Sequence, residues 1–284
     1  MFEAVAIVGV GLIGGSLGLA LKQAGFRGRV LGVSSEAALK AAVARGAIDA
    51  GLPLEEAVPQ ADLVYLAQPI HRILETLTRL DPLVRPGALV TDAGSTKARI
   101  VEAGRRAIRR AQFLGGHPMA GKETRGAAEA EADLFAGRTY VLTPLDLAEL
   151  ETVPARDFLG WLGAIGAAPL ILGPEEHDRI VAHTSHLPQL LSTALAATLA
   201  ERLAAPEDLR VAGPGLADMT RLAAGPYDIW GDILATNQPA IEAALDALMG
   251  ELASLRSALG AQGAQETFER ANRFVARLKQ QHRA

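Results

Sequence analysis

The spacing of three glycines near the N-terminus constrains the fold of this chain more than any other feature. Gly9, Gly11 and Gly14 form the pattern G-x-G-x-x-G. They stand between AVAIVGV (residues 4–10), which predicts a strand, and LIGGSLGLALKQAG (residues 12–25), which has the apolar spacing of a helix. In such a unit the first glycine permits the tight turn, the second lets a pyrophosphate approach the backbone, and the third allows close helix–strand packing. The sequence therefore predicts a dinucleotide-binding Rossmann unit.

The expected cofactor site extends beyond the glycines. We expect contacts from Leu12 and Ile13 in the first helix, and from Gln68 and Pro69 at the end of the strand predicted over residues 61–69. A strand–helix turn that binds nothing, a flavin site and a methyltransferase site share the glycine pattern, so they stay open as alternatives.

The end of the second predicted strand bears on the choice of cofactor. In NAD-binding domains an acid at this position bonds the ribose 2′-hydroxyl. Here the strand predicted over residues 29–34 ends at Ser34, followed by Ser35 and Glu36, so no acid stands at its tip. Small hydroxyls can bond a 2′-phosphate that an acid would repel, which favours NADP. No arginine follows directly to clamp the phosphate, and Glu36 lies close by, so NAD stays open.

Strands and helices alternate through the first half of the chain. Such alternation predicts a parallel sheet with right-handed crossovers. The expected strands are residues 4–10, 29–34, 61–69, 88–95, 111–116, 139–144 and 168–174, and the expected helices are residues 12–25, 35–46 and 96–110. After Pro174 the pattern changes to long amphipathic helical stretches. We therefore expect a doubly wound, mostly parallel Rossmann domain over residues 1–173 and an all-α domain over residues 174–284.

GGHPMAG (residues 115–121) places one ionisable ring among small residues, in a segment expected to be a loop. This segment and TDAGSTK (residues 91–97) each follow a predicted strand, and ligands of doubly wound sheets bind beyond the carboxyl ends of the strands. Ser95, Lys97 and His117 are therefore expected to converge near the nicotinamide. A neutral imidazole suits the removal of a proton from an alcohol while hydride leaves, and Ser95 could orient it. The alternative is a histidine that only bonds the backbone.

Composition excludes several classes of protein. A net charge of −4 provides no basic field for nucleic acid or a membrane surface, and the absence of cysteine excludes disulfides, thiolate metal sites and thiol nucleophiles. The apolar N-terminal stretch contains glycines that break a membrane helix, and it lacks the pattern of a signal peptide. We expect a soluble, cytoplasmic protein that acts on small molecules.

Five motifs together carry a family resemblance. In chain order they are VGVGLIGGSLG, DAGSTK, GGHPMAGKETRG, HDRIVAHTSHLPQ and GLADMTRLAAGPYDIWGDI. Between about residues 4 and 240 the chain resembles the prephenate/arogenate dehydrogenase family of tyrosine biosynthesis. The histidine segment and SHLP are specific to that family, whereas the glycine pattern is not.

The resemblance implies an oxidative decarboxylation of a cyclohexadienyl ring that carries a hydroxyl and a carboxylate on opposite carbons. Hydride passes from the hydroxyl-bearing carbon to NAD(P), carbon dioxide leaves from across the ring, and the ring becomes aromatic. By the same resemblance His117 bonds the ring hydroxyl and acts as the general base, Ser95 holds its ring, and Lys97 belongs to the same polar cluster. Prephenate, giving 4-hydroxyphenylpyruvate, is the expected substrate, and arogenate with NADP, giving tyrosine directly, is the alternative.

A substrate with two carboxylates calls for a guanidinium, which can bind a carboxylate with two parallel hydrogen bonds. The resemblance assigns this role to Arg221. It also implies that Glu123 pairs with Arg221 in the empty enzyme and gates the site, and Asp218 is expected to position Arg221. A solvated or structural ion pair is the ordinary alternative for an arginine on a helical domain.

The SHLPQ motif adds substrate-binding candidates. His183 and His186 are three residues apart, so a regular helix places them on one face. Pro188 removes one helical hydrogen bond, and a kink there is expected to direct His186 and Gln189 into the cleft. Packing at a helix junction is the alternative for both histidines.

Gln189 departs from the family pattern. Many members that prefer prephenate carry a second histidine at this position. A glutamine can bond a carboxylate or an amine but cannot become cationic, so it puts the substrate in doubt. Together with the serines at the strand tip, it favours arogenate, although prephenate remains the first expectation.

Three other interpretations stay open. The histidines of this region, with His177 and Asp178, suggest zinc, but their spacing is not a standard ligand set, and we expect no metal. A relative of the 6-phosphogluconate type would use a lysine base on its helical domain and lack HPMAG. A non-catalytic nucleotide sensor would have little reason to keep His117, Ser95 and Arg221 together.

The C-terminal half suits dimerisation. IEAALDALMGELASLRSAL (residues 241–259) repeats apolar residues at the spacing of a buried helix. The resemblance implies interlocked helical domains, hence a homodimer with each cleft near the other subunit. Trp230 and Asp232 are expected to line that junction, and core packing is the alternative for Trp230.

Overall fold

The computed structural model describes residues 2–203, 205, 207–260 and 263–281. By its internal contacts the chain forms two compact units, Met1–Gln238 and Pro239–Ala284. The domain boundary expected at residue 173 stays a prediction, and its outer limits, residues 1 and 284, lie outside the described residues. Within the described residues, no helix is long and apolar enough to cross a membrane.

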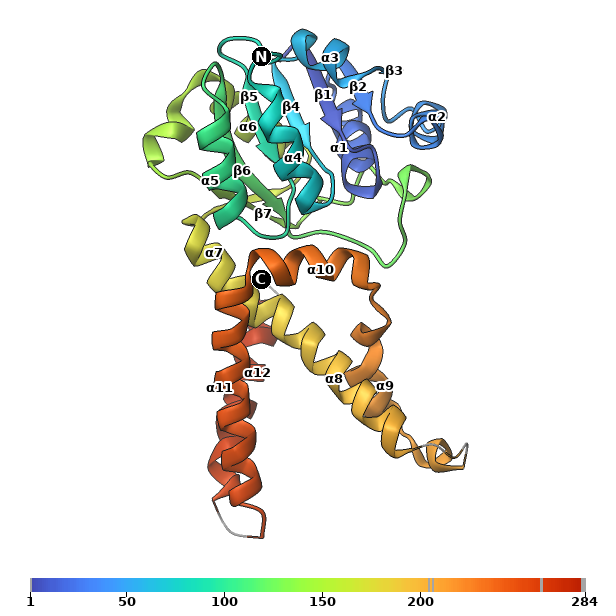
Figure 1. Cartoon of the computed structure of the whole chain (residues 1–284), viewed down its shortest axis with the longest axis vertical. Coiled ribbons are helices and arrows are strands. Elements are labelled where there is room, and N and C mark those ends of the chain that lie inside the picture. Colours follow the sequence, from blue (N-terminus) through green and yellow to red (C-terminus); the bar gives the residue numbers. More distant parts are fainter. Residues whose placement is uncertain (1, 204, 206, 261–262, 282–284) are drawn as a thin grey trace. The chain divides into compact units, whose positions relative to one another are not determined.

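The first unit contains an eight-stranded sheet with the order β3-β2-β1-β4-β5-β6-β7-β8 (Figure 1). Its strands are β1 (Ala4–Val8), β2 (Arg29–Val33), β3 (Ala50–Gly51), β4 (Leu63–Leu66), β5 (Leu89–Asp92), β6 (Gln112–Pro118), β7 (Thr139–Thr143) and β8 (Ala168–Ile171). All neighbours are parallel except β6 and β7. Successive strands are added on one side of β1 up to β3 and then on its other side from β4 onward. This change in strand order confirms the predicted doubly wound fold.

Helices cover both faces of this sheet. They are α1 (Leu12–Gln23), α2 (Glu36–Ala44), α3 (Leu54–Ala57), α4 (Ile70–Leu80), α5 (Ala98–Ala107) and α6 (Val153–Ala164). Figure 1 shows α4 and α5 side by side on one face. On the other face, Trp161 of α6 packs edge-on against Phe26, which follows α1, with ring centroids 5.2 Å apart. Strands β1, β4 and β5 are consequently buried along their whole length, as their apolar runs predict.

One expectation about the strands is wrong. The strand expected over residues 111–116 extends further, because β6 continues through His117 to Pro118, where a loop was expected. The first half of β6 pairs with β5, and the second half pairs antiparallel with β7, which supplies the hydrogen bonds that a loop would lack. A Cβ at Gly116 would lie 2.7 Å from the carbonyl oxygen of Asp92, so the close approach of these strands requires glycine there.

The rest of the chain is helical, with no strand after β8 in the described part. The first unit continues with α7 (Pro174–Val181), α8 (Leu187–Arg202), α9 (Pro214–Thr220) and α10 (Tyr227–Thr236). A π-helical turn, η4 (Ala182–His186), joins α7 to α8 directly before Pro188. The local irregularity expected around this proline is therefore a π-turn, a feature frequent at functional sites.

The second unit consists of α11 (Gln238–Ser257) and α12 (Ala264–Gln281). Glu251 of α11 pairs with Arg270 of α12, which ties the two helices together. Ile241 and Ala244 are buried as the sequence pattern predicts. Many large apolar side chains of this unit are nevertheless exposed in the single chain: Met249, Leu252, Leu259, Phe268, Phe274, Val275 and Leu278.

Candidate active site

His117 lies at the carboxyl edge of the sheet, near the end of β6, and its ring is partly buried. Its Nδ1 lies 2.8 Å from Nε2 of His177, which α7 carries. Nδ1 of His177 lies in turn 2.8 Å from Oδ1 of Asp178. His177 and Asp178 are both buried, so this chain of hydrogen bonds is shielded from water.

Asp178 determines which atom donates in each of these two hydrogen bonds. A carboxylate only accepts, so Nδ1 of His177 carries the proton that Asp178 receives. In a neutral His177 ring, Nε2 is then an acceptor, and Nδ1 of His117 must donate to it. A neutral His117 therefore keeps the lone pair on its own Nε2 free. In this arrangement the atom is free to accept a proton.

Asp178 is itself fixed by the first turn of α5. Its Oδ1 accepts from the backbone N–H of Lys97 at 2.6 Å, and its Oδ2 accepts from that of Ala98 at 2.9 Å. These N–H groups have no intrahelical partner, and the positive end of the helix favours a carboxylate. Asp178 thus joins α7 to the helix that follows β5.

Several surroundings keep His117 neutral. Burial lowers its pKa well below the usual 6.5, and the neighbouring His177, Lys97 and His186 lower it further. The direction of this pKa shift matters, because only the unprotonated ring can act as a base.

Lys97 supports the backbone beside His117. Its buried amino group forms an ion pair with Asp92 and donates to the carbonyl oxygen of Gly116 at 2.7 Å. Asp92 also accepts from the backbone N–H of Gly94 at 2.8 Å and of Gly116 at 3.1 Å. Burial lowers the pKa of Lys97, while Asp92 acts to raise it. The expected catalytic role of Lys97 stays a prediction, and these contacts favour an indirect one.

Ser95 does not hold the imidazole in this structure. Among the described residues no hydrogen bond joins Ser95 to His117, and the partner of Nδ1 of that ring is His177. A catalytic role of Ser95 stays a prediction. The motif HDRIVAHTSHLPQ contains His177 and Asp178, but in the sequence they suggest only zinc ligands. In the described part of the chain, no group of three histidine or acidic side chains is placed to hold a metal ion.

His186 lies deeper than the sequence suggests. It is buried while His183 is exposed, so the expectation of a shared face is wrong, because the π-turn changes the rotation per residue. Burial lowers the pKa of His186 to about 4, which keeps it neutral. Its ring packs edge-on against Trp230 at 6.1 Å, and its Nδ1 lies 3.3 Å from Nδ2 of Asn237. Asn237, which no sequence pattern singled out, also donates to the carbonyl oxygen of Asp178 at 2.8 Å.

The expected pairing of Arg221 with Glu123 is present. Their closest atoms, Nη1 and Oε1, are 3.4 Å apart, and both side chains are largely exposed. Asp218 is exposed and, among the described residues, forms no hydrogen bond to Arg221, so its expected positioning role finds no support. Asp232, which was expected to line the junction between subunits, pairs with His71 at the start of α4. Its Oδ2 lies 2.7 Å from Nδ1 of His71.

The glycine loop has the geometry that a dinucleotide requires. Gly9 has a φ of +98°, and a Cβ on Gly14 would lie 2.1 Å from the carbonyl oxygen of Gly9. Over Gly11, by contrast, a Cβ would meet no atom within 4 Å, so the space there is open. The N-terminus of α1 has no side-chain cap, which leaves the N–H groups of Leu12 and Ile13 for an anion. The residues present therefore fit the pyrophosphate of a dinucleotide.

Two further segments reach the same edge of the sheet. Gln68, after β4, packs near Gly9 and accepts from the hydroxyl of Thr76 at 2.8 Å, and Pro69 begins α4. Ser34, after β2, is exposed. Ser35 caps α2 by accepting from a backbone N–H at 3.4 Å. Contacts of these residues with a cofactor stay predictions.

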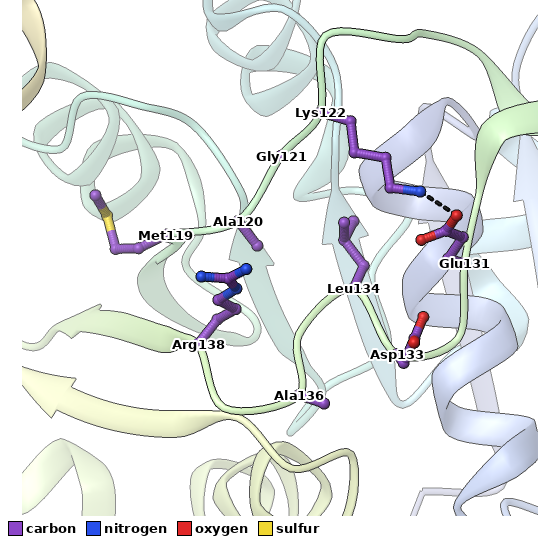
Figure 2. A pocket seen from close by; sticks show the side chains of 9 residues that line it. All are labelled: Met119, Ala120, Gly121, Lys122, Glu131, Asp133, Leu134, Ala136 and Arg138. Carbon is purple, nitrogen blue, oxygen red and sulfur yellow. Dashed lines mark ion pairs between the residues drawn. The ribbon is translucent and has the colours of Figure 1, made fainter. Parts of the chain in front are cut away.

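A pocket of about 410 Å³ opens between the segment that leaves β6 and the segment that enters β7 (Figure 2). Charges of both signs line it: Lys122, Glu131, Asp133 and Arg138. Lys122 and Glu131 pair with each other, as Figure 2 shows. None of the site residues expected from the sequence lines this pocket. The pocket is therefore distinct from the buried relay of His117, His177 and Asp178.

Two protein-family models match successive parts of this chain. A family model described as the nucleotide-binding domain of prephenate dehydrogenase matches residues 17–164. A second model, described as the dimerization domain of prephenate dehydrogenase, matches residues 173–280.

Individual proteins give the same result. The chain is 34% identical to a prephenate dehydrogenase of Lactococcus lactis over 82% of this chain and 64% of that protein. It is 32% identical to that of Bacillus subtilis over 94% of this chain and 73% of that protein. A cyclohexadienyl dehydrogenase of Zymomonas mobilis is 27% identical over 99% of this chain and 98% of that protein. The chain thus spans a little under two thirds of the Lactococcus protein.

Solved structures are similar over nearly the whole chain. A prephenate dehydrogenase from Aquifex aeolicus, in complex with hydroxyphenyl propionate and NAD+, has a TM-score of 0.83 and 29% identity over 99% of this chain and 97% of that chain. An arogenate dehydrogenase from Synechocystis has a TM-score of 0.79 and 29% identity over 98% of each chain. These two structures, one named for each substrate, are thus equally similar to this chain in sequence.

Proposed function

Because this chain belongs to the prephenate dehydrogenase family, a family of NAD(P)-dependent oxidoreductases, we propose that it converts prephenate to 4-hydroxyphenylpyruvate by oxidative decarboxylation. One observation carries the proposal: the hydrogen-bonded chain from Asp178 through His177 to His117, at the edge of the sheet where the glycine loop also opens. A dehydrogenase that oxidises an alcohol needs a neutral base at this place.

The proton of the ring hydroxyl passes to Nε2 of His117. The His117 imidazolium formed in this step is stabilised through His177 by the carboxylate of Asp178. A dinucleotide held by the glycine loop would supply the acceptor for the hydride of the hydroxyl-bearing carbon. Carbon dioxide leaves from the opposite carbon as the ring becomes aromatic.

Cationic and neutral donors are available for the rest of the substrate. Arg221 offers a largely exposed guanidinium that can exchange Glu123 for a substrate carboxylate. Asn237 donates to Nδ1 of His186, so the neutral ring of His186 carries its proton on Nε2 and can donate to a carboxylate or keto oxygen.

Arogenate with NADP is the second candidate. The absence of an acid at the exposed tip of β2, where Ser34 stands, favours a 2′-phosphate. The similarity to the Synechocystis arogenate dehydrogenase supports the same alternative.

We also propose a homodimer. The match to a dimerization-domain family supports it, and so do the exposed apolar side chains of α11 and α12, which a second copy would cover.

Initial rates of reduced-nicotinamide formation test the proposal, with prephenate or arogenate crossed against NAD or NADP. Identification of the aromatic product separates the two substrates. We expect turnover of prephenate to exceed that of arogenate. Turnover of arogenate alone would transfer the assignment to the second candidate, and turnover of neither would overturn both.

A further inference from the structure

Arg221 begins a short turn that has little support of its own. The turn η6 (Arg221–Ala224) directly follows α9. The side chain of Arg221 is 63% exposed, and that of its partner Glu123 is 88% exposed. Exposed ion pairs fix a side chain only weakly. The position of this guanidinium therefore depends on how firmly the backbone of the turn is held.

Gln189 of α8 is hydrogen-bonded to the backbone of this turn. Its Nε2 donates to the carbonyl oxygen of Leu222 at 2.8 Å, and the same oxygen accepts from the backbone N–H of Gly225 at 2.9 Å. The second N–H of the amide lies 3.2 Å from Oγ1 of Thr193. A carbonyl only accepts, so the contact with Leu222 fixes which end of the buried amide faces the turn.

Ser192 makes a second attachment one residue further along the turn. The backbone N–H of Ala223 donates to its Oγ at 3.0 Å, and Ser192 is 1% exposed. Gln189 and Ser192 are three residues apart on α8, so they project from one helix face towards η6. Figure 1 shows α9, which leads into this turn, alongside α8.

We propose that Gln189 and Ser192 are positioning residues, which fix the turn after Arg221 so that its guanidinium meets a substrate carboxylate. The proposal rests on the proposed function for the role of Arg221. It replaces the expected direct contact of Gln189 with substrate, because both N–H groups of its amide are already engaged within the chain.

Substrate kinetics distinguish positioning from direct contact. Prephenate and arogenate carry the same carboxylates and differ only in a keto or an amino group. Gln189→Leu and Ser192→Ala should each raise KM about 2- to 10-fold, the effect of losing one hydrogen bond, and by the same factor for both substrates, with kcat unchanged. Thr198→Ala, which removes only a bond to the backbone of α8 itself, is the matched control. A change in KM for one substrate alone would overturn the proposal in favour of direct contact.

A double-mutant cycle tests whether the effect runs through Arg221. On an Arg221→Gln background, Ser192→Ala should raise KM no further, because the group that it positions is gone. An equal increase on both backgrounds would contradict the proposal. Ser192→Ala is the smaller change, so it decides the outcome where Gln189→Leu does not fold.

Hydrogen exchange tests the attachment without any turnover. In both variants the amides of residues 221–225 should exchange faster than in the wild type and in Thr198→Ala. Unchanged exchange would overturn the proposal even in an active enzyme. Failure of the wild type to oxidise either substrate would instead count against the proposed function, while the exchange result still decides whether the two side chains hold the turn.

Discussion

Nδ1 of His117 lies 2.8 Å from Nε2 of His177, although 60 residues separate them in the chain. Since Asp178 accepts from the other nitrogen of His177, the direction of both hydrogen bonds is set by a buried carboxylate. The hydrogen bonding of His117, the proposed base, is therefore set by α7, an element outside the sheet on which His117 lies.

Replacement of the Asp178 carboxylate tests whether the relay contributes to turnover. In Asp178→Asn the acceptor becomes an amide, the imidazolium of His117 loses its counter-charge, and kcat should fall by at least about 10²-fold, in the range of lost base catalysis. The control is Glu176→Gln, an exposed acid on the same helix. Steady-state kinetics of both variants check this, and an unchanged kcat in Asp178→Asn would remove the relay from the mechanism.

The pH profile should reflect the lowered pKa of His117. Burial and the neighbouring His177, Lys97 and His186 lower this pKa well below 6.5, so the ring stays unprotonated as the pH falls through 6.5. We expect kcat/KM to remain level there and to decline only at lower pH, where the free enzyme binds the proton. An acid limb centred at or above pH 6.5 would contradict this environment.

His186 should make stability depend on pH. Its pKa is about 4 in the folded chain and near 6.5 in the unfolded chain, so between these values the unfolded state binds more protons. The free energy of unfolding should rise with pH across this window, by roughly 3 kcal/mol in full. Denaturant titrations between pH 4 and 7 measure the slope. His186→Gln should reduce the slope, whereas substitution of the exposed His183 should not; equal slopes in all three proteins would refute the assignment.

Arg221 should matter for binding more than for chemistry. Arg221→Gln removes a charged, two-pronged contact with a carboxylate, so KM should rise about 10- to 100-fold with kcat changed little. Arg202→Gln, an exposed arginine at the end of α8, serves as the control. If KM in Arg221→Gln equals that of the wild type, another cation holds the carboxylate.

The exposed tip of β2 offers a test of cofactor choice. Ser34→Asp places an acid where it can bond a ribose 2′-hydroxyl and repel a 2′-phosphate. The ratio of kcat/KM with NADP to that with NAD should therefore fall. A constant ratio would mean that this strand tip does not contact the ribose.

Local features of the chain could be predicted well. The glycine loop joins adjacent segments, so the strand and helix beside Gly9, Gly11 and Gly14 follow from spacing alone. The alternation of strands with helices likewise predicts the doubly wound sheet. The pairing of Glu123 with Arg221 came from the family resemblance and is present.

Partners from distant segments could not be derived in this way. The sequence shows that His177 and Asp178 are adjacent, but only the packing of α7 against α5 brings them to His117. The glycines around His117 suggest a loop, and only the antiparallel pairing with β7 makes that segment a strand. The sequence likewise does not show that the amide of Gln189 donates to the carbonyl oxygen of Leu222, which lies 33 residues away in the chain.

The turnover of His117→Asn tests the central claim most directly. Asparagine keeps a polar side chain but cannot act as the base, so turnover should fall about 10²- to 10⁴-fold. Fluorescence titration with the reduced cofactor should give the same Kd as in the wild type, because the glycine loop is unchanged. Turnover near that of the wild type, with the cofactor still bound, would contradict the account and require a different base.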